Sequence, residues 1–271
     1  MTHSLRKRQE DYESDYDFKI QKRLPIAIKV TLKNYKRLTQ NLDKPFCEEL
    51  SEVMGQTALF IISQIQDAVF GYCQNDEIVF VLRNDKTHDN EPWCGNNLQK
   101  IVSSVSSLAT IGFKKSVDIF GDDLDLVGDG LFVVNVFSLP YLAEAANYLV
   151  FRQGLCLGAA INKAVSYELD KKFGKRKAVE LMKDTSFEEK IQMLLQYCGV
   201  DFYDYYLAFF IYGTAVYKIP VIVSTRGDDI TKNKWYIDYN IPNFTKDKDF
   251  VPAILSNGAD VFRAPDFIEA S

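Results

Sequence analysis

Two adjacent carboxylates give the clearest chemical signal in the sequence. Asp76 and Glu77 follow Gln74 and Asn75 at a polar turn between two apolar runs, in the stretch QDAVFGYCQNDEIVFVL at residues 66–82. Both runs are rich in Val, Ile and Phe, which predicts a β-hairpin with the two acids beside its turn. Paired carboxylates at a strand edge can hold a hard cation such as Mg²⁺. The alternative is a solvated acidic turn, which is the commoner role of such a pair.

The elements around this hairpin must position the two acids. Residues 26–32, IAIKVTL, predict a buried strand, and residues 131–139 predict another apolar strand. Residues 48–66 carry apolar side chains at a period near 3.6 and predict a helix, as do residues 97–113. The order strand, helix, hairpin, helix, strand is typical of an antiparallel sheet with helices on one face, as in ferredoxin-like palm domains.

The second half of the sequence is expected to be more helical. Helices are predicted over residues 141–168, 175–182 and 187–198, a short amphipathic helix over 5–20, and late strands at 215–223 and 235–237. The expected fold class is therefore α+β. A palm-like domain of residues 1–140 would carry the N-terminal helix, and residues 141–271 would form a helical part with C-terminal strands, packed on the palm as one compact unit.

Composition narrows the function classes. The chain has 271 residues, a formal net charge of −5 and a pI near 5.2, so any contact with nucleic acid must come from a local basic face. Five scattered cysteines without a CxxC pair argue against a disulfide framework and favour a reducing cytoplasm. With only His3 and His88, a histidine triad or a His-rich metal site is not expected. No apolar run approaches the length of a membrane span.

Basic and aromatic clusters leave their roles open. A group of cations after the first strand could meet phosphates or form a solvated face; its members are Lys29, Lys33, Lys36, Arg37 and Lys44. The run KKFGKRK at residues 171–177 is an RNA-backbone contact or a charged helix end. An aromatic patch at residues 203–212 is expected to pack against the palm rather than stack on bases.

The hairpin also carries a resemblance to a known family. GYCQNDEIVFVL, residues 71–82, resembles the GYxQSDE segment of the tRNA-His guanylyltransferase (Thg1) family, particularly its bacterial and archaeal Thg1-like members, which add nucleotides in the 3′-to-5′ direction. Further similar segments are PIAIKVTLKNYKRLTQNLDKPF at 25–46, NLQKIVS at 97–103, YLVFRQ at 148–153 and WYIDYNIPNF at 235–244. These segments follow the family's order over nearly the whole sequence.

This resemblance implies a polymerase-like palm in which two Mg²⁺ ions serve phosphoryl transfer. They would be held by an aspartate on the first strand, the carbonyl that follows it and the hairpin aspartate. It also implies GTP or ATP as ligands, the 5′ end of a tRNA or other RNA as partner, and cytoplasmic tRNA processing. The expected assembly is a homo-tetramer or dimer, or a hetero-oligomer with a Thg1-like paralogue.

The resemblance assigns site residues by position. Asp76 and Glu77 are the expected catalytic residues and metal ligands, while Thr31 and Leu32 occupy the other two expected ligand positions. The expected nucleotide- or RNA-binding residues are Lys29, Lys33, Asn34, Lys44, Asn75, Lys100, Ser103, Arg152 and Gln153.

The sequence departs from the family where chemistry is expected. Thr31 replaces the first-strand aspartate, and a neutral hydroxyl is a weak Mg²⁺ ligand, so a weakened metal site is expected. FVVN at 132–135 stands where the family has F-D-x-R, apolar GLCLGAA at 154–160 replaces a polar stretch, and Tyr212 replaces a basic residue.

Two hypotheses about function follow from these departures. The chain is a divergent Thg1-like 3′-to-5′ nucleotidyltransferase, impaired or repurposed, or a non-catalytic Thg1-like subunit that binds nucleotide, RNA or a protein partner, such as an active paralogue.

Overall fold

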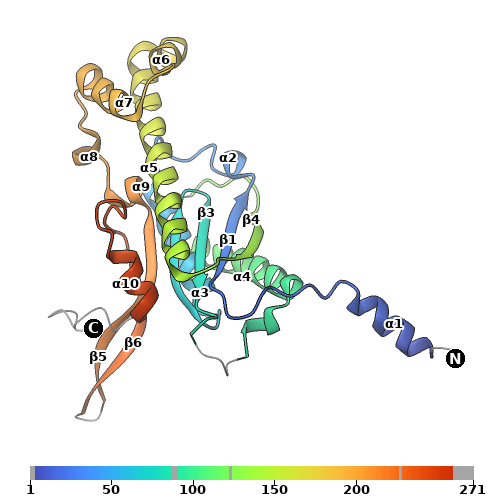
Figure 1. Cartoon of the computed structure of the whole chain (residues 1–271). Coiled ribbons are helices and arrows are strands. Elements are labelled where there is room, and N and C mark those ends of the chain that lie inside the picture. Colours follow the sequence, from blue (N-terminus) through green and yellow to red (C-terminus); the bar gives the residue numbers. More distant parts are fainter. Residues whose placement is uncertain (1–3, 87–90, 122–123, 226–227, 259–271) are drawn as a thin grey trace.

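A six-stranded sheet is the centre of the fold (Figure 1). The computed structural model describes residues 4–86, 91–121, 124–225 and 228–258. The strand order is β4-β1-β3-β2-β5-β6, and each neighbouring pair is antiparallel. The strands are β1 (Ile26–Lys33), β2 (Ala68–Gln74), β3 (Glu77–Leu82), β4 (Leu131–Ser138), β5 (Thr214–Thr225) and β6 (Asp228–Asp238). The expected α+β class with an antiparallel sheet is confirmed.

Helices α3 (Glu48–Ile62) and α4 (Leu98–Phe120) cover one face of the sheet. Successive strand side chains point to opposite faces, so alternate residues of β1 such as Ile28 and Val30 face these helices and are fully buried. The helix predicted over residues 48–66 ends earlier, at Ile62. The palm's own helices thus lie on one face, as the order of elements predicted.

Helix α5 (Leu142–Phe173) and helix α10 (Phe250–Asn257) cover the other face. Phe70 and Tyr72 of β2 and Val79 of β3 pack there in a second apolar cluster. The sheet therefore has a hydrophobic layer on each side, and its central strands are almost completely buried.

The outer half of α5 carries a third apolar cluster, with α6 (Lys175–Met182), a π-helical turn η2 (Leu194–Cys198), α8 (Phe202–Tyr205) and α9 (Ala208–Tyr212). The remaining elements are α1 (Leu5–Ser14), α2 (Tyr35–Leu38), η1 (Trp93–Asn96) and α7 (Phe187–Met193). Helix α1 buries none of its residues and extends away from the sheet (Figure 1). Among the described residues, none of the helices combines the length and apolar character needed to cross a bilayer.

The late strands are longer than predicted. Strand β6 begins at Asp228 instead of residue 235 and pairs with β5 along its whole length. Its first half, DDITKNK, is polar and lacks the β-branched or aromatic run by which strands are recognised in a sequence. Backbone pairing with β5 nevertheless holds it in the sheet, because the ladder hydrogen bonds do not depend on side-chain type.

Gln153 ties α5 to the chain that follows β6. Its side chain is 3% exposed, and its Nε2 donates to the carbonyl of Pro242 at 2.9 Å and of Tyr212 at 3.3 Å. Its Oε1 accepts from the Phe244 N–H at 2.6 Å. One buried amide thus satisfies three backbone groups and fixes the position of α5.

Gly213, between α9 and β5, provides a test of this packing. Its φ of 81° and ψ of −168° suit only glycine, and a Cβ there would lie 2.7 Å from the Cys73 carbonyl oxygen. Gly213→Ala should lower the free energy of unfolding by ~3 kcal/mol or more, measured by urea denaturation. Gly199→Ala is the matched control, because Gly199 has a φ of 71° but open space around it, so about 1 kcal/mol is expected. Equal losses would contradict the close approach at Gly213.

Candidate functional site

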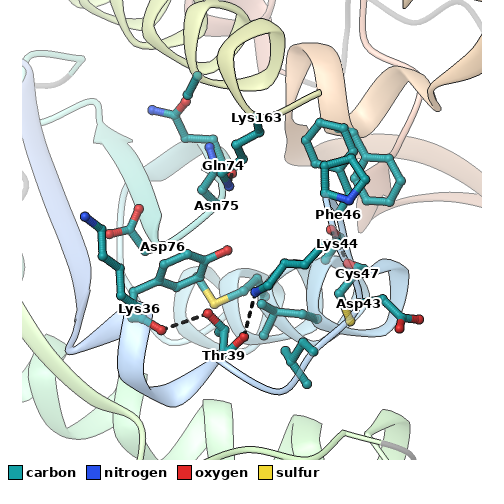
Figure 2. Close-up of a pocket in the computed structure, with 18 of the residues that line it drawn as sticks. Lys36, Thr39, Asp43, Lys44, Phe46, Cys47, Gln74, Asn75, Asp76 and Lys163 are labelled. Atoms are coloured by element: carbon teal, nitrogen blue, oxygen red, sulfur yellow. Dashed lines mark hydrogen bonds between the residues drawn. The ribbon is translucent and has the colours of Figure 1, made fainter. Parts of the chain in front are cut away.

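A pocket of about 980 Å³ lies where β1 and β2 end and β5 begins (Figure 2). The segment after β1, the start of α3, the β2–β3 turn, α5 and α9 form its wall. This volume is at the upper end of the range typical of small-molecule sites. The charged side chains in the wall are the cations Lys36, Arg37, Lys44 and Lys163 and the carboxylates Asp43, Asp76 and Asp170.

The predicted hairpin places one of its two acids at this pocket. Strand β2 ends at Gln74 and β3 begins at Glu77, so Asn75 and Asp76 form the turn. Asn75 has a φ of 44°, a left-handed conformation that asparagine tolerates better than most residues. The Leu32 N–H donates to the Asp76 carbonyl oxygen at 2.7 Å and holds the turn against the end of β1. Asp76 therefore lines the pocket from a fixed backbone position.

Glu77 has a different environment. It pairs with Thr31 across the sheet and is not among the pocket-lining residues. Its Oε1 lies 2.5 Å from Nη2 of Arg152, which comes from α5, and its Oε2 lies 4.0 Å from Nζ of Lys29. The Glu77 side chain is 10% exposed, and two cations of its own chain balance its charge. Glu77 therefore forms an ion pair between β3 and α5, as expected of a residue with a structural role.

The donors implied by the resemblance do not fit a pair of Mg²⁺ ions. Of the two acids, only Asp76 lines the pocket, while Glu77 is engaged by Arg152. Thr31 offers a neutral hydroxyl on β1, beside Glu77. Within the described part of the chain, no group of three or more His, Cys, Asp or Glu residues is arranged to hold a metal. A two-metal centre needs carboxylates that converge from separate strands, and this geometry does not provide them.

The predicted nucleotide- or RNA-binding residues divide into two groups. Asn34, Lys44 and Asn75 line the pocket, and Lys44 Nζ donates to the Thr39 carbonyl at 3.0 Å. The others lie outside the wall. Lys29 and Arg152 pair with Glu77, Gln153 binds backbone groups, Lys33 is exposed at the end of β1, and Lys100 and Ser103 lie in the first turns of α4.

The sequence analysis missed Lys163, the residue of α5 that reaches the turn. Its Nζ donates to Oδ1 of Asn75 at 2.5 Å and lies 5.6 Å from the centre of the Tyr35 ring (Figure 2). Burial lowers the pKa of Lys163 below its ordinary value, while the Asp76 carboxylate raises it. The helical spacing of the sequence could have indicated this position of Lys163. Cys156, Ala159 and Lys163 recur every three or four residues and therefore share one helix face.

Aromatic side chains also line the pocket. Phe46 and Phe210 stack with ring centroids 4.7 Å apart and planes 10° apart, and both line the pocket. Tyr35 also lines it, and burial, followed by the Asp76 charge, raises the pKa of this tyrosine to about 12. From the aromatic patch at residues 203–212, Tyr206 packs in the third cluster, whereas Tyr203 and Tyr205 are exposed.

Comparisons with known proteins identify the family. A family model described as tRNAHis guanylyltransferase, Thg1, matches residues 6–140, which include β1, the hairpin and β4. This segment belongs to the Thg1 family. The resemblance predicted from the sequence is thereby confirmed. A search of curated proteins finds no match to the chain.

Solved structures of Thg1-like proteins share the fold over most of the chain. A bacterial Thg1-like protein in complex with ATP is 22% identical, with a TM-score of 0.77, covering 94% of this chain and 100% of its own. The same kind of protein in complex with GTP has a TM-score of 0.69 at the same identity and coverage. The tRNA(His) guanylyltransferase of Saccharomyces cerevisiae is 18% identical, with a TM-score of 0.66, covering 82% of this chain and 95% of its own. The Thg1-like fold therefore extends beyond residue 140 into the C-terminal half.

The ion pair of Glu77 and Arg152 provides a prediction for this region. Glu77→Ala leaves a guanidinium that is 15% exposed without its partner, and should lower the free energy of unfolding by about 3–5 kcal/mol in urea denaturation. Glu180→Ala is the matched control, because Glu180 forms an ion pair with Lys177 and is 67% exposed, so a loss below about 1 kcal/mol is expected. A Glu77→Ala protein as stable as the unsubstituted chain would show that Glu77 is free for another role.

Proposed function

We propose that this Thg1-like chain binds a nucleoside triphosphate in the pocket and that its two-metal 3′-to-5′ nucleotidyl transfer is lost. The observation that carries the proposal is the grouping of Asn34, Lys44, Asn75 and Asp76 in one pocket, while Glu77 is engaged elsewhere. These four residues stand at positions where the family resemblance implies nucleotide or metal contacts. The bacterial Thg1-like structures, solved with ATP and with GTP, support the same ligand class.

The chemistry of the pocket wall suits the two ends of such a ligand. Ammonium and guanidinium groups form charge-assisted hydrogen bonds with phosphate oxygens, and Lys36, Arg37 and Lys44 come from the segment that follows β1. The stacked Phe46 and Phe210 rings offer an apolar surface for a nucleobase. In this arrangement the phosphates lie near the hairpin turn and the base lies near the aromatic pair.

The second candidate function is retained nucleotidyl transfer to the 5′ end of a tRNA or other RNA. The presence of Asp76 at the pocket favours it, because this acid stands at the position of the hairpin metal ligand. In the first proposal the chain is a cytoplasmic non-catalytic subunit that binds nucleotide beside RNA or a protein partner, in a homo-oligomer or with a Thg1-like paralogue that retains the first-strand aspartate.

One experiment separates the two functions. The purified chain is mixed with Mg²⁺, labelled GTP or ATP, and tRNA carrying a 5′-monophosphate or a 5′-triphosphate. Both bound nucleotide and label at the RNA 5′ end are measured. The proposal predicts binding without incorporation. Incorporation that Asp76→Ala abolishes would establish the second candidate, and absence of both binding and incorporation would contradict the proposal.

Lys44 tests whether this pocket is the binding site. Lys44→Met should weaken nucleotide binding about tenfold or more, because it removes a cation from the phosphate contacts. Lys114→Met is the matched control, since Lys114 is exposed on α4 and outside the pocket wall. Binding should be measured by equilibrium dialysis with labelled GTP and ATP. An equal effect of the two substitutions would place the nucleotide elsewhere.

A further inference from the structure

Lys163 bridges α5 and the hairpin turn inside the pocket. Its partner Asn75 is 88 residues away in the sequence, and the donor–acceptor distance is 2.5 Å. Asp76 follows Asn75 directly and lines the same wall. The ammonium of Lys163 therefore lies next to the residue that would hold a metal ion in a two-metal site.

Charged groups of this wall act on the Lys163 ammonium. Burial is the largest cause and lowers the pKa of Lys163; Asp76 and Cys156 raise this pKa, and Lys44 lowers it. Lys44, Asp76 and Lys163 all line the pocket, and the first two act on the Lys163 ammonium there. Over the whole wall, the cations Lys36, Arg37, Lys44 and Lys163 outnumber the carboxylates Asp43, Asp76 and Asp170 by one, which leaves a positive charge that a phosphate group can balance.

Small side chains on α5 allow this contact. Cys156 and Ala159 line the pocket on the same helix face as Lys163, and both lie within the apolar stretch of residues 154–160. This stretch replaces polar family residues, so the polar contribution of α5 to the pocket comes from one helical turn further along. Lys163, Ser166 and Asp170 form that polar continuation of the face.

The hairpin side of the pocket contains an unsatisfied group. The Gln74 side chain is 7% exposed and lines the pocket, yet its Oε1 accepts no hydrogen bond from any residue that the structure describes. Buried amide oxygens in folded proteins normally have a donor. A ribose hydroxyl of a bound nucleotide, adjacent to phosphates held at Lys163, would satisfy it.

We propose that Lys163 and Lys44 bind the phosphate chain of the nucleotide directly, and that this binding needs no divalent cation. The inference rests on the proposed nucleotide binding and specifies how the charge is balanced. In a two-metal site, metal ions would screen the Asp76 carboxylate from the phosphates. Here the donors do not fit such ions, and the Lys163 ammonium supplies the positive charge beside Asp76.

The test is equilibrium binding of labelled ATP and GTP to the full chain, in Mg²⁺ and in EDTA. The two dissociation constants should agree within about threefold, because neutralisation comes from the protein itself. Lys163→Met should weaken binding about tenfold or more in both buffers, and Lys163→Arg should retain most of it. The Lys114→Met control should bind as the unsubstituted chain does.

Asp76→Asn gives the sharpest distinction, because the two accounts predict opposite signs. If Lys163 neutralises the phosphates directly, removing the Asp76 charge removes a repulsion and strengthens binding in EDTA. If metal ions mediate binding, the same substitution removes a ligand and weakens binding in Mg²⁺. Thermal unfolding of each variant verifies that it is folded.

Three outcomes overturn the inference while leaving the proposed function in place. These are binding that occurs only in Mg²⁺, binding that Asp76→Asn weakens, and Lys163 variants that both bind as the unsubstituted chain does. Absence of nucleotide binding in both buffers contradicts the proposed function itself and the inference with it.

Discussion

The site depends on the two-residue turn between β2 and β3 and on the hydrogen bond that holds it. The Leu32 N–H donates to the Asp76 carbonyl oxygen, which holds the turn against the end of β1. Asn75 and Asp76 then contribute to the pocket wall, and Asn75 presents its side-chain oxygen to Lys163. One residue later Glu77 enters β3, where Arg152 engages its carboxylate. Adjacent acids therefore have unlike environments because one lies in a turn and the other in a buried strand.

Helix α5 supplies the partners on the other side. Arg152 reaches Glu77, Gln153 holds the backbone at Tyr212, Pro242 and Phe244, and Lys163 reaches the turn. Lys163 follows Arg152 by eleven residues, about three helical turns, so both side chains can project from the same face of α5. The helix thus contacts β3 and the C-terminal backbone through residues near its start, and it supplies a lysine to the pocket about three turns further along.

Much of the fold could be predicted from periodicity. The strand at residues 26–32, the hairpin and the helices at 48–66 and 175–182 have strong local patterns, and β1, β2, β3, α3 and α6 lie there. Strand β6 was underestimated because its polar first half is held by pairing with β5, which is a long-range effect. The resemblance to the Thg1 family predicted Asn34, Lys44, Asn75 and Asp76 as site residues, and all four line one pocket. The contacts of Lys163 and Glu77 could not be predicted, since their partners lie far away in the sequence.

The central claim is that protein ammonium groups, without a metal pair, hold the phosphates beside Asp76. Its most direct test is a crystal structure of the chain grown with ATP and Mn²⁺, with anomalous scattering recorded to locate manganese. The account predicts a triphosphate in contact with Lys163 and Lys44 and no anomalous peak at Asp76. Two manganese ions between Asp76 and the phosphates, or a nucleotide bound outside this pocket, would contradict it.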